Sequence, residues 1–347
     1  MGHYPYLKKH HIPTELVLTD RLVTLLMQIA EERPFLQKSV GTPLEVKLLR
    51  KAKIRAITYS NQIEGNHLEE DQVTAIVAGK RVKGSSDDVT EVKNYHEAID
   101  YVETLAKDQR RLTVRDICDI QQLVIKGQLP PALCGALRSA PASIINSITR
   151  EVIEEYPPHY DLPFLMEELL QWLEDNSARN PFVLAFASHF IAVAIHPFAD
   201  GNGRTVRLLQ HYLLLRGGET IAQFVPSETS IMAQRDRYYL SIRQCRTLER
   251  LDPFVEFMAE CFASSAVQVS LEARALLKEV AGKTPNQRHE KIIRFVASKG
   301  EVSSAQIYEH FSDVPKRTLE RDLAELVKRK KLKVKGLTRA RRYFVKS

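Results

Sequence analysis

The densest cluster of chemically active side chains lies at residues 196–207, with the sequence His-Pro-Phe-Ala-Asp-Gly-Asn-Gly-Arg-Thr-Val-Arg. It follows an apolar segment, residues 182–195, and apolar residues begin again at Val206. Glycine, asparagine and aspartate break helices, so the pattern predicts a tight loop that leads into the N-terminus of a new helix. At such a place the backbone amides of Gly201 and Gly203 can approach an anion closely, and the positive end of the helix attracts it. We therefore expect the loop to bind phosphate.

The side chains of this loop are those that phosphate chemistry needs. Arg204 and Arg207 lie three residues apart on the new helix, so both guanidinium groups can reach one polyphosphate. Asp200 offers the hard oxygen ligand that Mg²⁺ prefers. His196, with an ordinary pKa of about 6.5, can accept a proton from an attacking hydroxyl near neutral pH. The pattern predicts a base, a metal ligand and a phosphate clamp in one short segment.

Three other motifs fit the segment less well. A P-loop needs lysine before the serine or threonine that follows its last glycine, whereas Arg204 precedes Thr205 here. An EF-hand would need oxygen ligands where Arg204 and His211 stand. A zinc site made of His189, His196 and His211 stays conceivable at near-helical spacing, but the intervening loop breaks that geometry.

Residues 196–207 match the His-Pro-Phe-x-Asp/Asn-Gly-Asn-Gly-Arg-x-x-Arg signature of the Fic family at every fixed position. The chain resembles that family over roughly residues 45–265. The resemblance implies a helical core that transfers AMP from ATP to a hydroxyl side chain of a target protein. Glycine at position 203, where relatives that act as kinases carry lysine, favours AMP transfer.

The resemblance also implies a role for each fixed residue. His196 would be the catalytic base, and Asp200 would hold Mg²⁺ between the α- and β-phosphates of ATP. The remaining residues would bind the phosphates: Gly201, Asn202 and Gly203 the α-phosphate, Arg204 and Arg207 the β- and γ-phosphates.

Residues 60–66, Ser-Asn-Gln-Ile-Glu-Gly-Asn, match the inhibitory Ser/Thr-x-x-x-Glu-Gly/Asn motif of the same family. Ser60, Glu64 and Gly65 are its fixed positions. The resemblance implies that Glu64 forms a salt bridge with Arg207 and so occupies the guanidinium that would hold the γ-phosphate. Family members can also use this glutamate to remove AMP, so the reverse reaction stays open.

Two weaker patterns flank the signature. Residues 138–158 alternate β-branched and polar side chains and end at Pro157-Pro158, which predicts a hairpin flap. Four flap residues fall where relatives pair edge-on with a target strand: Ala142, Ser143, Ile144 and Ile145. The sequence departs here from the common Val-hydrophobic-Gly pattern. An ordinary surface hairpin is the other interpretation. Tyr238 and Tyr239 resemble an aromatic pair that lines the adenosine pocket, with core packing as the alternative.

The elements that must position these residues are mainly helical. Apolar residues recur at spacings of three and four up to about Ala281, which predicts an all-α core of eight or nine helices. Gly282 and Pro285 indicate a linker after the last long helix. We expect three regions: a helical region with the inhibitory motif at 1–110, a catalytic core at 111–281 and a small domain at 284–347.

The positive charge of the chain belongs to the last region. Of 50 Lys and Arg and 43 Asp and Glu in the chain, residues 284–347 hold 17 and 7, a net charge of +10, whereas the rest has 33 and 36, a net charge of −3. Three short helical patterns and two strand patterns (332–335 and 342–345) predict a winged helix-turn-helix. We expect it to dock DNA or protein. A rival hypothesis is a DNA-binding regulator whose Fic domain acts mainly as an ATP sensor.

The composition excludes several other classes of protein. No uninterrupted apolar run approaches 18 residues, so we expect no membrane span. The N-terminus shows no hydrophobic signal-peptide region. The four cysteines, Cys118, Cys134, Cys245 and Cys261, form no CxxC pair, which favours free thiols in the cytoplasm. A homodimer and modification of the chain itself stay open.

Overall fold

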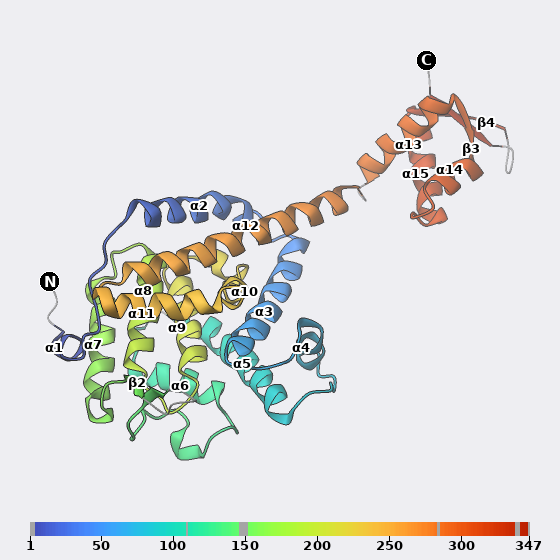
Figure 1. Cartoon of the computed structure of the whole chain (residues 1–347). Helices are drawn as coiled ribbons and strands as arrows, with labels where there is room; N and C mark the ends of the chain where they lie inside the picture. The colour runs from blue at the N-terminus through green and yellow to red at the C-terminus, as the bar shows by residue number, and fades with distance from the viewer. Residues whose placement is uncertain (1–3, 109, 146–151, 283–284, 337–340, 346–347) are drawn as a thin grey trace. The chain divides into compact units, whose positions relative to one another are not determined.

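The computed structural model describes residues 4–108, 110–145, 152–282, 285–336 and 341–345 (Figure 1). The chain divides into two compact units, Met1–Leu271 and Glu272–Ser347. Helices dominate both units, which confirms the predicted all-α class with minor β structure. All four cysteines are free, as expected, and three of them are buried.

The helices of the described part of the first unit are α1 (Pro5–Lys9), α2 (Asp20–Gln37), α3 (Pro43–Ile63), α4 (Glu70–Val77), α5 (Ser86–Leu105), α6 (Val114–Val124), α7 (Leu162–Asp175), α8 (Pro181–Ile195), α9 (Asn202–Arg216), α10 (Glu228–Ala233), α11 (Arg235–Leu248) and α12 (Asp252–Gly282), the last of which continues past the unit boundary. These exceed the eight or nine helices predicted, because α1, α4 and α10 are too short to show a helical repeat. The flap is a hairpin of β1 (Ser143–Ile145) and β2 (Val152–Glu155).

The centre of this unit is α8, which packs against α9. Twelve of the fifteen residues of α8 are buried, as expected for a helix that is apolar on every side. Its one buried imidazole, His189, is bonded by Gln210 Oε1 at 2.7 Å and the Tyr238 hydroxyl at 3.0 Å. Burial lowers the pKa of His189 to about 3. These bonds give His189 a structural role and leave the zinc alternative without support.

Two long helices lie along one side of the unit, where α2 runs beside α12 (Figure 1). Arg21 of α2 forms an ion pair with Glu260 of α12 at 2.5 Å. By length and composition, residues 252–277 of α12 could cross a membrane, but 67% of the apolar window is buried inside the structure. A buried core helix of a soluble protein passes the same test.

The second unit contains α13 (Pro285–Lys299), α14 (Ser304–His310) and α15 (Lys316–Lys328), with β3 (Glu301–Ser303), β4 (Leu332–Lys335) and β5 (Arg342–Val345). The strands form an antiparallel sheet in the order β3-β5-β4. The sequence predicted only the last two strands, because β3 has three residues and too little pattern to identify it. Helices and sheet share one apolar core, which includes Ile292, Leu319 and Tyr343.

Candidate functional site

The signature loop joins the end of α8 to the start of α9, as predicted. His196 ends α8 in the left-handed conformation, with φ 51° and ψ 61°, which turns the following chain away from the helix axis. Gly201 precedes α9 with φ 77°, a conformation that glycine adopts without steric penalty. Two left-handed residues therefore bend the chain sharply at either end of the loop.

The loop is held by its own polar groups. Asn202 Oδ1 accepts from the Phe198 amide at 3.0 Å, and Asn202 Nδ2 donates to the Phe198 carbonyl at 2.8 Å. Buried Gln121 of α6 donates to the Asp200 carbonyl at 3.1 Å and accepts from the Gly135 amide at 2.6 Å. The side chain of Asn202 thus braces the loop, which adds a structural role to the phosphate-binding role that the resemblance implies.

A cavity of about 440 Å³ opens beside the loop, which lies within the usual range for a small-molecule site. Its walls come from α3, the flap, α8, α9 and α11. The lining residues are Glu64, Tyr156, Val193, His196, Asn202, Gly203, Tyr238, Tyr239, Ile242, Arg243 and Arg246. Of the residues predicted to bind ATP, Asp200, Gly201, Arg204 and Arg207 are not among them.

The environment of His196 favours the neutral imidazole. Burial lowers its pKa to about 4, and the positive charges of Arg138 and Arg246 act in the same direction. The Val193 backbone and Glu64 oppose this shift. Since a neutral imidazole is the form that accepts a proton, His196 is ready to act as a base at neutral pH.

Arg207 is buried and bound to the inhibitory motif. Its Nη2 donates to Glu64 Oε1 at 2.8 Å and to the Ser60 carbonyl at 2.9 Å, and its Nε donates to Ser60 Oγ at 2.8 Å. Burial lowers the pKa of Arg207, but Glu64 outweighs that effect, and the pKa lies above its ordinary value. The ion pair that the resemblance implied is therefore present.

Gly65 and Gly203 are both needed for this contact. Gly65 has φ 105° and lets the chain turn at the end of α3, directly after Glu64. A Cβ at Gly203 would lie 2.1 Å from Glu64 Oε1, well inside van der Waals contact. The carboxylate can reach Arg207 only because position 203 has no side chain.

Arg204 points to a different carboxylate. Its Nη1 lies 3.0 Å from Glu91 Oε1 of α5, and Asn66 Nδ2 donates to the other oxygen of Glu91 at 2.8 Å. Arg204 is 3% exposed. The expectation that both arginines reach along one helix face toward a single polyphosphate is not met in this conformation, because each is held by its own acidic partner.

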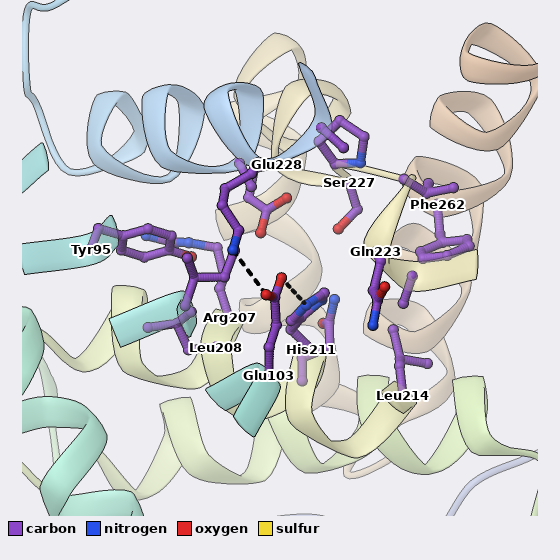
Figure 2. Close-up of a pocket in the computed structure, with 18 residues that line it drawn as sticks. Tyr95, Glu103, Arg207, Leu208, His211, Leu214, Gln223, Ser227, Glu228 and Phe262 are labelled. Carbon is purple, nitrogen blue, oxygen red and sulfur yellow. Dashed lines mark hydrogen bonds and ion pairs between the residues drawn. The ribbon is translucent and has the colours of Figure 1, made fainter. Parts of the chain in front are cut away.

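Arg207 lines a second, much smaller cavity (Figure 2). Its volume is about 30 Å³, enough for one or two water molecules. Lys53 and His211 face Glu103 there, at 2.8 and 3.9 Å, and these partners hold the pKa of Glu103 at about 2 although burial raises it. A nucleotide does not fit here, so the larger cavity is the candidate site.

The two tyrosines have different environments. Tyr238 is 3% exposed and bonds His189, whereas Tyr239 is 41% exposed. The guanidinium of Arg235 lies 5.6 Å from the centre of the Tyr239 ring. Tyr238 therefore belongs mainly to the core, as the alternative interpretation held, while both residues contribute to the cavity wall.

The predicted flap residues lie at the start of the hairpin. Ser143 and Ile144 pair with Glu155 and Glu154, and the register shifts before Ile145. The Ala142 carbonyl accepts from the Tyr156 amide at 3.0 Å. The tip of the flap, residues 146–151, lies outside the described residues.

The sequence interpretation missed several residues around His196. Tyr156 stacks on the imidazole, Arg243 and Arg246 line the cavity, and Arg138 binds the His196 carbonyl through Nε at 2.9 Å. Arg138 and Tyr156 lie near the two ends of the predicted flap, residues 138–158, and this position could have pointed to them. Arginines in the middle of α11 carried no signal of their own.

No cluster of three or more metal-ligating side chains occurs among the residues that the structure describes. Asp200 is exposed, and its Oδ1 accepts from the Gly201 amide at 2.6 Å. Its other oxygen, Oδ2, is the one that could bind a metal ion. Mg²⁺ commonly uses one or two carboxylates together with substrate phosphates. A single carboxylate therefore fits Mg²⁺ that arrives with a nucleotide.

Residues 111–214 match the Fic/DOC family. The chain is 32% identical over 243 residues to "Protein adenylyltransferase Fic" of Nematostella vectensis, a match that covers 68% of this chain and 53% of that protein. The protein of the same name from Drosophila melanogaster is 32% identical over 221 residues, covering 61% and 42%. The chain thus spans about half the length of these relatives.

The chain is also similar to Fic proteins of known structure. A Fic family protein from Desulfovibrio desulfuricans G20 matches with a TM-score of 0.65 and 27% identity, covering 95% of this chain and 97% of that one. A Fic domain containing signaling protein from Bacteroides thetaiotaomicron shares the fold, with a TM-score of 0.61 at 22% identity, covering 74% and 97%.

The loop geometry predicts that Gly201→Ala destabilises the protein. The substitution adds a left-handed alanine, and its Cβ would lie 2.6 Å from Ile125 Cγ2. We expect a loss of about 2–4 kcal/mol in urea unfolding, from backbone strain and overpacking together. Gly218→Ala is the matched control, since Gly218 has φ 82° and no atom within 4 Å of the added Cβ; it should lose only about 1–2 kcal/mol. Equal losses in both variants would contradict the crowding at Gly201.

Proposed function

Because the chain is a Fic family protein, we propose that it is an autoinhibited protein adenylyltransferase that moves AMP from ATP to a hydroxyl side chain of a target protein. The observation that carries this proposal is the 440 Å³ cavity in which His196 and Gly203 stand beside Glu64. The names of the relatives, protein adenylyltransferase Fic, support the same reaction.

The proposed reaction uses residues of the cavity wall and of the adjoining loop. The target hydroxyl oxygen bonds to the α-phosphorus of ATP, the bond from that phosphorus to the bridging oxygen breaks, and diphosphate leaves. The hydroxyl proton passes to the neutral imidazole of His196. Mg²⁺, held by Asp200, would supply charge neutralisation on the phosphates. The amides of the loop and the N-terminus of α9 add positive potential without moving.

The bonds of Arg207 support autoinhibition. Its guanidinium already binds a carboxylate and two groups of Ser60. A buried cation is stable only when it is paired, so a terminal phosphate that binds Nη2 of Arg207 must displace Glu64 from it. We propose that in the present conformation ATP binds without that contact, in a pose that does not support transfer. Removal of AMP with the help of the same carboxylate stays a prediction.

Glu64→Gly should therefore raise AMP transfer by about tenfold or more, because loss of a charge-assisted hydrogen bond of about 1.5–3 kcal/mol frees Arg207 for the γ-phosphate. The measurement is incorporation of labelled AMP from ATP and Mg²⁺ into the chain itself and into lysate proteins. Glu64→Gln, which keeps the shape but removes the charge, should fall between the wild type and Glu64→Gly.

The control is Glu64→Gly combined with His196→Ala, which should incorporate no AMP because the base is gone. Equal labelling by wild type and Glu64→Gly would refute autoinhibition. Labelling that survives His196→Ala would refute the assignment of the base.

A second candidate function, docking to DNA, is favoured by the charge of the second unit. Three basic side chains, Lys316, Arg317 and Arg321, are exposed on α15, and its opposite face buries Leu319 and Leu323 in the core. Phosphate neutralisation dominates non-specific affinity for DNA. We propose that this unit is a winged helix whose basic face docks duplex DNA, with protein docking as the alternative outcome.

Charge reversal tests the docking. In the full chain, the triple substitution Lys316→Glu, Arg317→Glu and Arg321→Glu should weaken binding to a DNA duplex at least tenfold and flatten its salt dependence. The matched control reverses three exposed charges of α13, Lys291, Arg294 and Lys299, and should lose less. No binding of the wild type to the duplex would favour protein docking, and equal loss in both variants would contradict the assignment to the basic face of α15.

A further inference from the structure

We propose, building on the adenylyltransferase function, that Tyr156 is a positioning residue whose ring fixes the orientation of the His196 imidazole and ties that orientation to the flap. Tyr156 belongs to neither the signature nor the inhibitory motif. It contacts His196, the start of the flap and α11.

The first observation is the stacking of the two rings. The Tyr156 and His196 ring centres lie 3.9 Å apart, with an angle of 18° between the planes. A parallel contact at this distance leaves no room for the imidazole to tilt toward the phenol. Because His196 is the cap residue that directly follows α8 and has left-handed backbone angles, its ring lacks the packing that the interior of a helix would give it. The stacked tyrosine supplies that packing from outside the helix.

The second observation is the place of Tyr156 in the flap. It directly follows β2, and its amide donates to the carbonyl of Ala142, next to β1. The same residue thus closes the hairpin with its backbone and covers the base with its side chain. If a target strand pairs with the edge of the hairpin, a shift of the hairpin backbone also moves the Tyr156 ring, which contacts His196.

Arg138 joins the flap to the signature loop. The side chain is 4% exposed. Its Nε donates to the His196 carbonyl at 2.9 Å, and its Nη1 donates to the Ala140 carbonyl at 2.8 Å. Its Nη2 donates to the carbonyl of Pro157, the residue after Tyr156. Both ends of the flap and the backbone of the base are therefore bonded to one buried guanidinium, which keeps the Tyr156 ring in register with the imidazole.

The third observation is the support of the tyrosine by α11. The guanidinium of Arg246 lies 5.6 Å from the centre of the Tyr156 ring. Its Nη2 also donates to the Ala194 carbonyl in the last turn of α8, at 3.2 Å. Arg246 thus connects the tyrosine to α8, the helix that directly precedes His196. Tyr156, His196 and Arg246 all line the cavity. Tyr156 is therefore held in place beside the base that the target hydroxyl must reach.

Stacking also keeps water from one face of the imidazole. The charged groups that face His196 are Arg138 before the flap, Glu64 at the end of α3 and Arg246 on α11, and burial is the largest influence on its pKa. Removing the tyrosine ring would admit water and raise that pKa from about 4 toward the ordinary value of 6.5. A residue with a merely structural role elsewhere would not produce this change.

The direct test is an NMR titration of the His196 imidazole in the full chain, with the resonance assigned by its loss in His196→Ala. In Tyr156→Leu the pKa should rise by one unit or more, whereas Tyr156→Phe, which keeps the ring, should titrate like the wild type. Tyr160→Leu is the matched control, since Tyr160 is a neighbouring, 66% exposed tyrosine. Tyr156→Met replaces Tyr156→Leu if the latter does not fold. Equal pKa values in the leucine or methionine variant and in Tyr156→Phe would overturn the proposal.

A kinetic test in the Glu64→Gly background asks whether the orientation matters for AMP transfer. Tyr156→Leu should lower kcat by about tenfold to a hundredfold and leave KM for ATP within about a factor of two, and Tyr156→Phe should restore kcat. The acid limb of the rate profile should move to higher pH in Tyr156→Leu, because the rate needs the neutral base. If Glu64→Gly itself transfers no AMP, the adenylyltransferase function fails, whereas the NMR titration still decides the role of Tyr156.

Discussion

The buried guanidinium of Arg207 is the constraint around which the site is organised. A side chain that is 1% exposed and permanently charged must be paired at every stage of function, because an unpaired buried charge is strongly destabilising. Here the partners come from one short segment, with Ser60 and Glu64 both at the end of α3. Any ligand that uses Arg207 must replace them with an anion of its own, and the terminal phosphate of a nucleotide is such an anion.

Residues 60–66 contact one arginine of the signature directly and the acidic partner of the other. Glu64 binds Arg207 directly, and Asn66, two residues later, binds the carboxylate of Glu91 that faces Arg204. The left-handed turn at Gly65 lets one segment direct both contacts. Movement of this turn would take Glu64 from Arg207 and Asn66 from Glu91, but it would not by itself break the ion pair between Arg204 and Glu91.

The sequence predicted the parts of the site whose chemistry is local. The loop, the start of α9, the helical class and the partner of Arg207 could all be inferred from residue types and a family signature. The pairing of Arg204 with Glu91, the internal bonds of Asn202 and the stacking of Tyr156 could not, because each depends on residues that the tertiary fold brings together. Gly203 illustrates the difference: its residue type favoured AMP transfer, but only the structure shows that a Cβ there would collide with Glu64. Short elements such as α4 and β3 were missed because a few residues carry too little periodicity.

The central claim is that Glu64 occupies the group that would otherwise bind the γ-phosphate. The most direct measurement compares the affinities of ATP and ADP, in the presence of Mg²⁺, for the wild type and for Glu64→Gly by titration calorimetry. The account predicts that the wild type binds the two nucleotides about equally, whereas Glu64→Gly prefers ATP by about tenfold, the effect of one charge-assisted contact. A wild type that already prefers ATP as strongly as the variant does would contradict it.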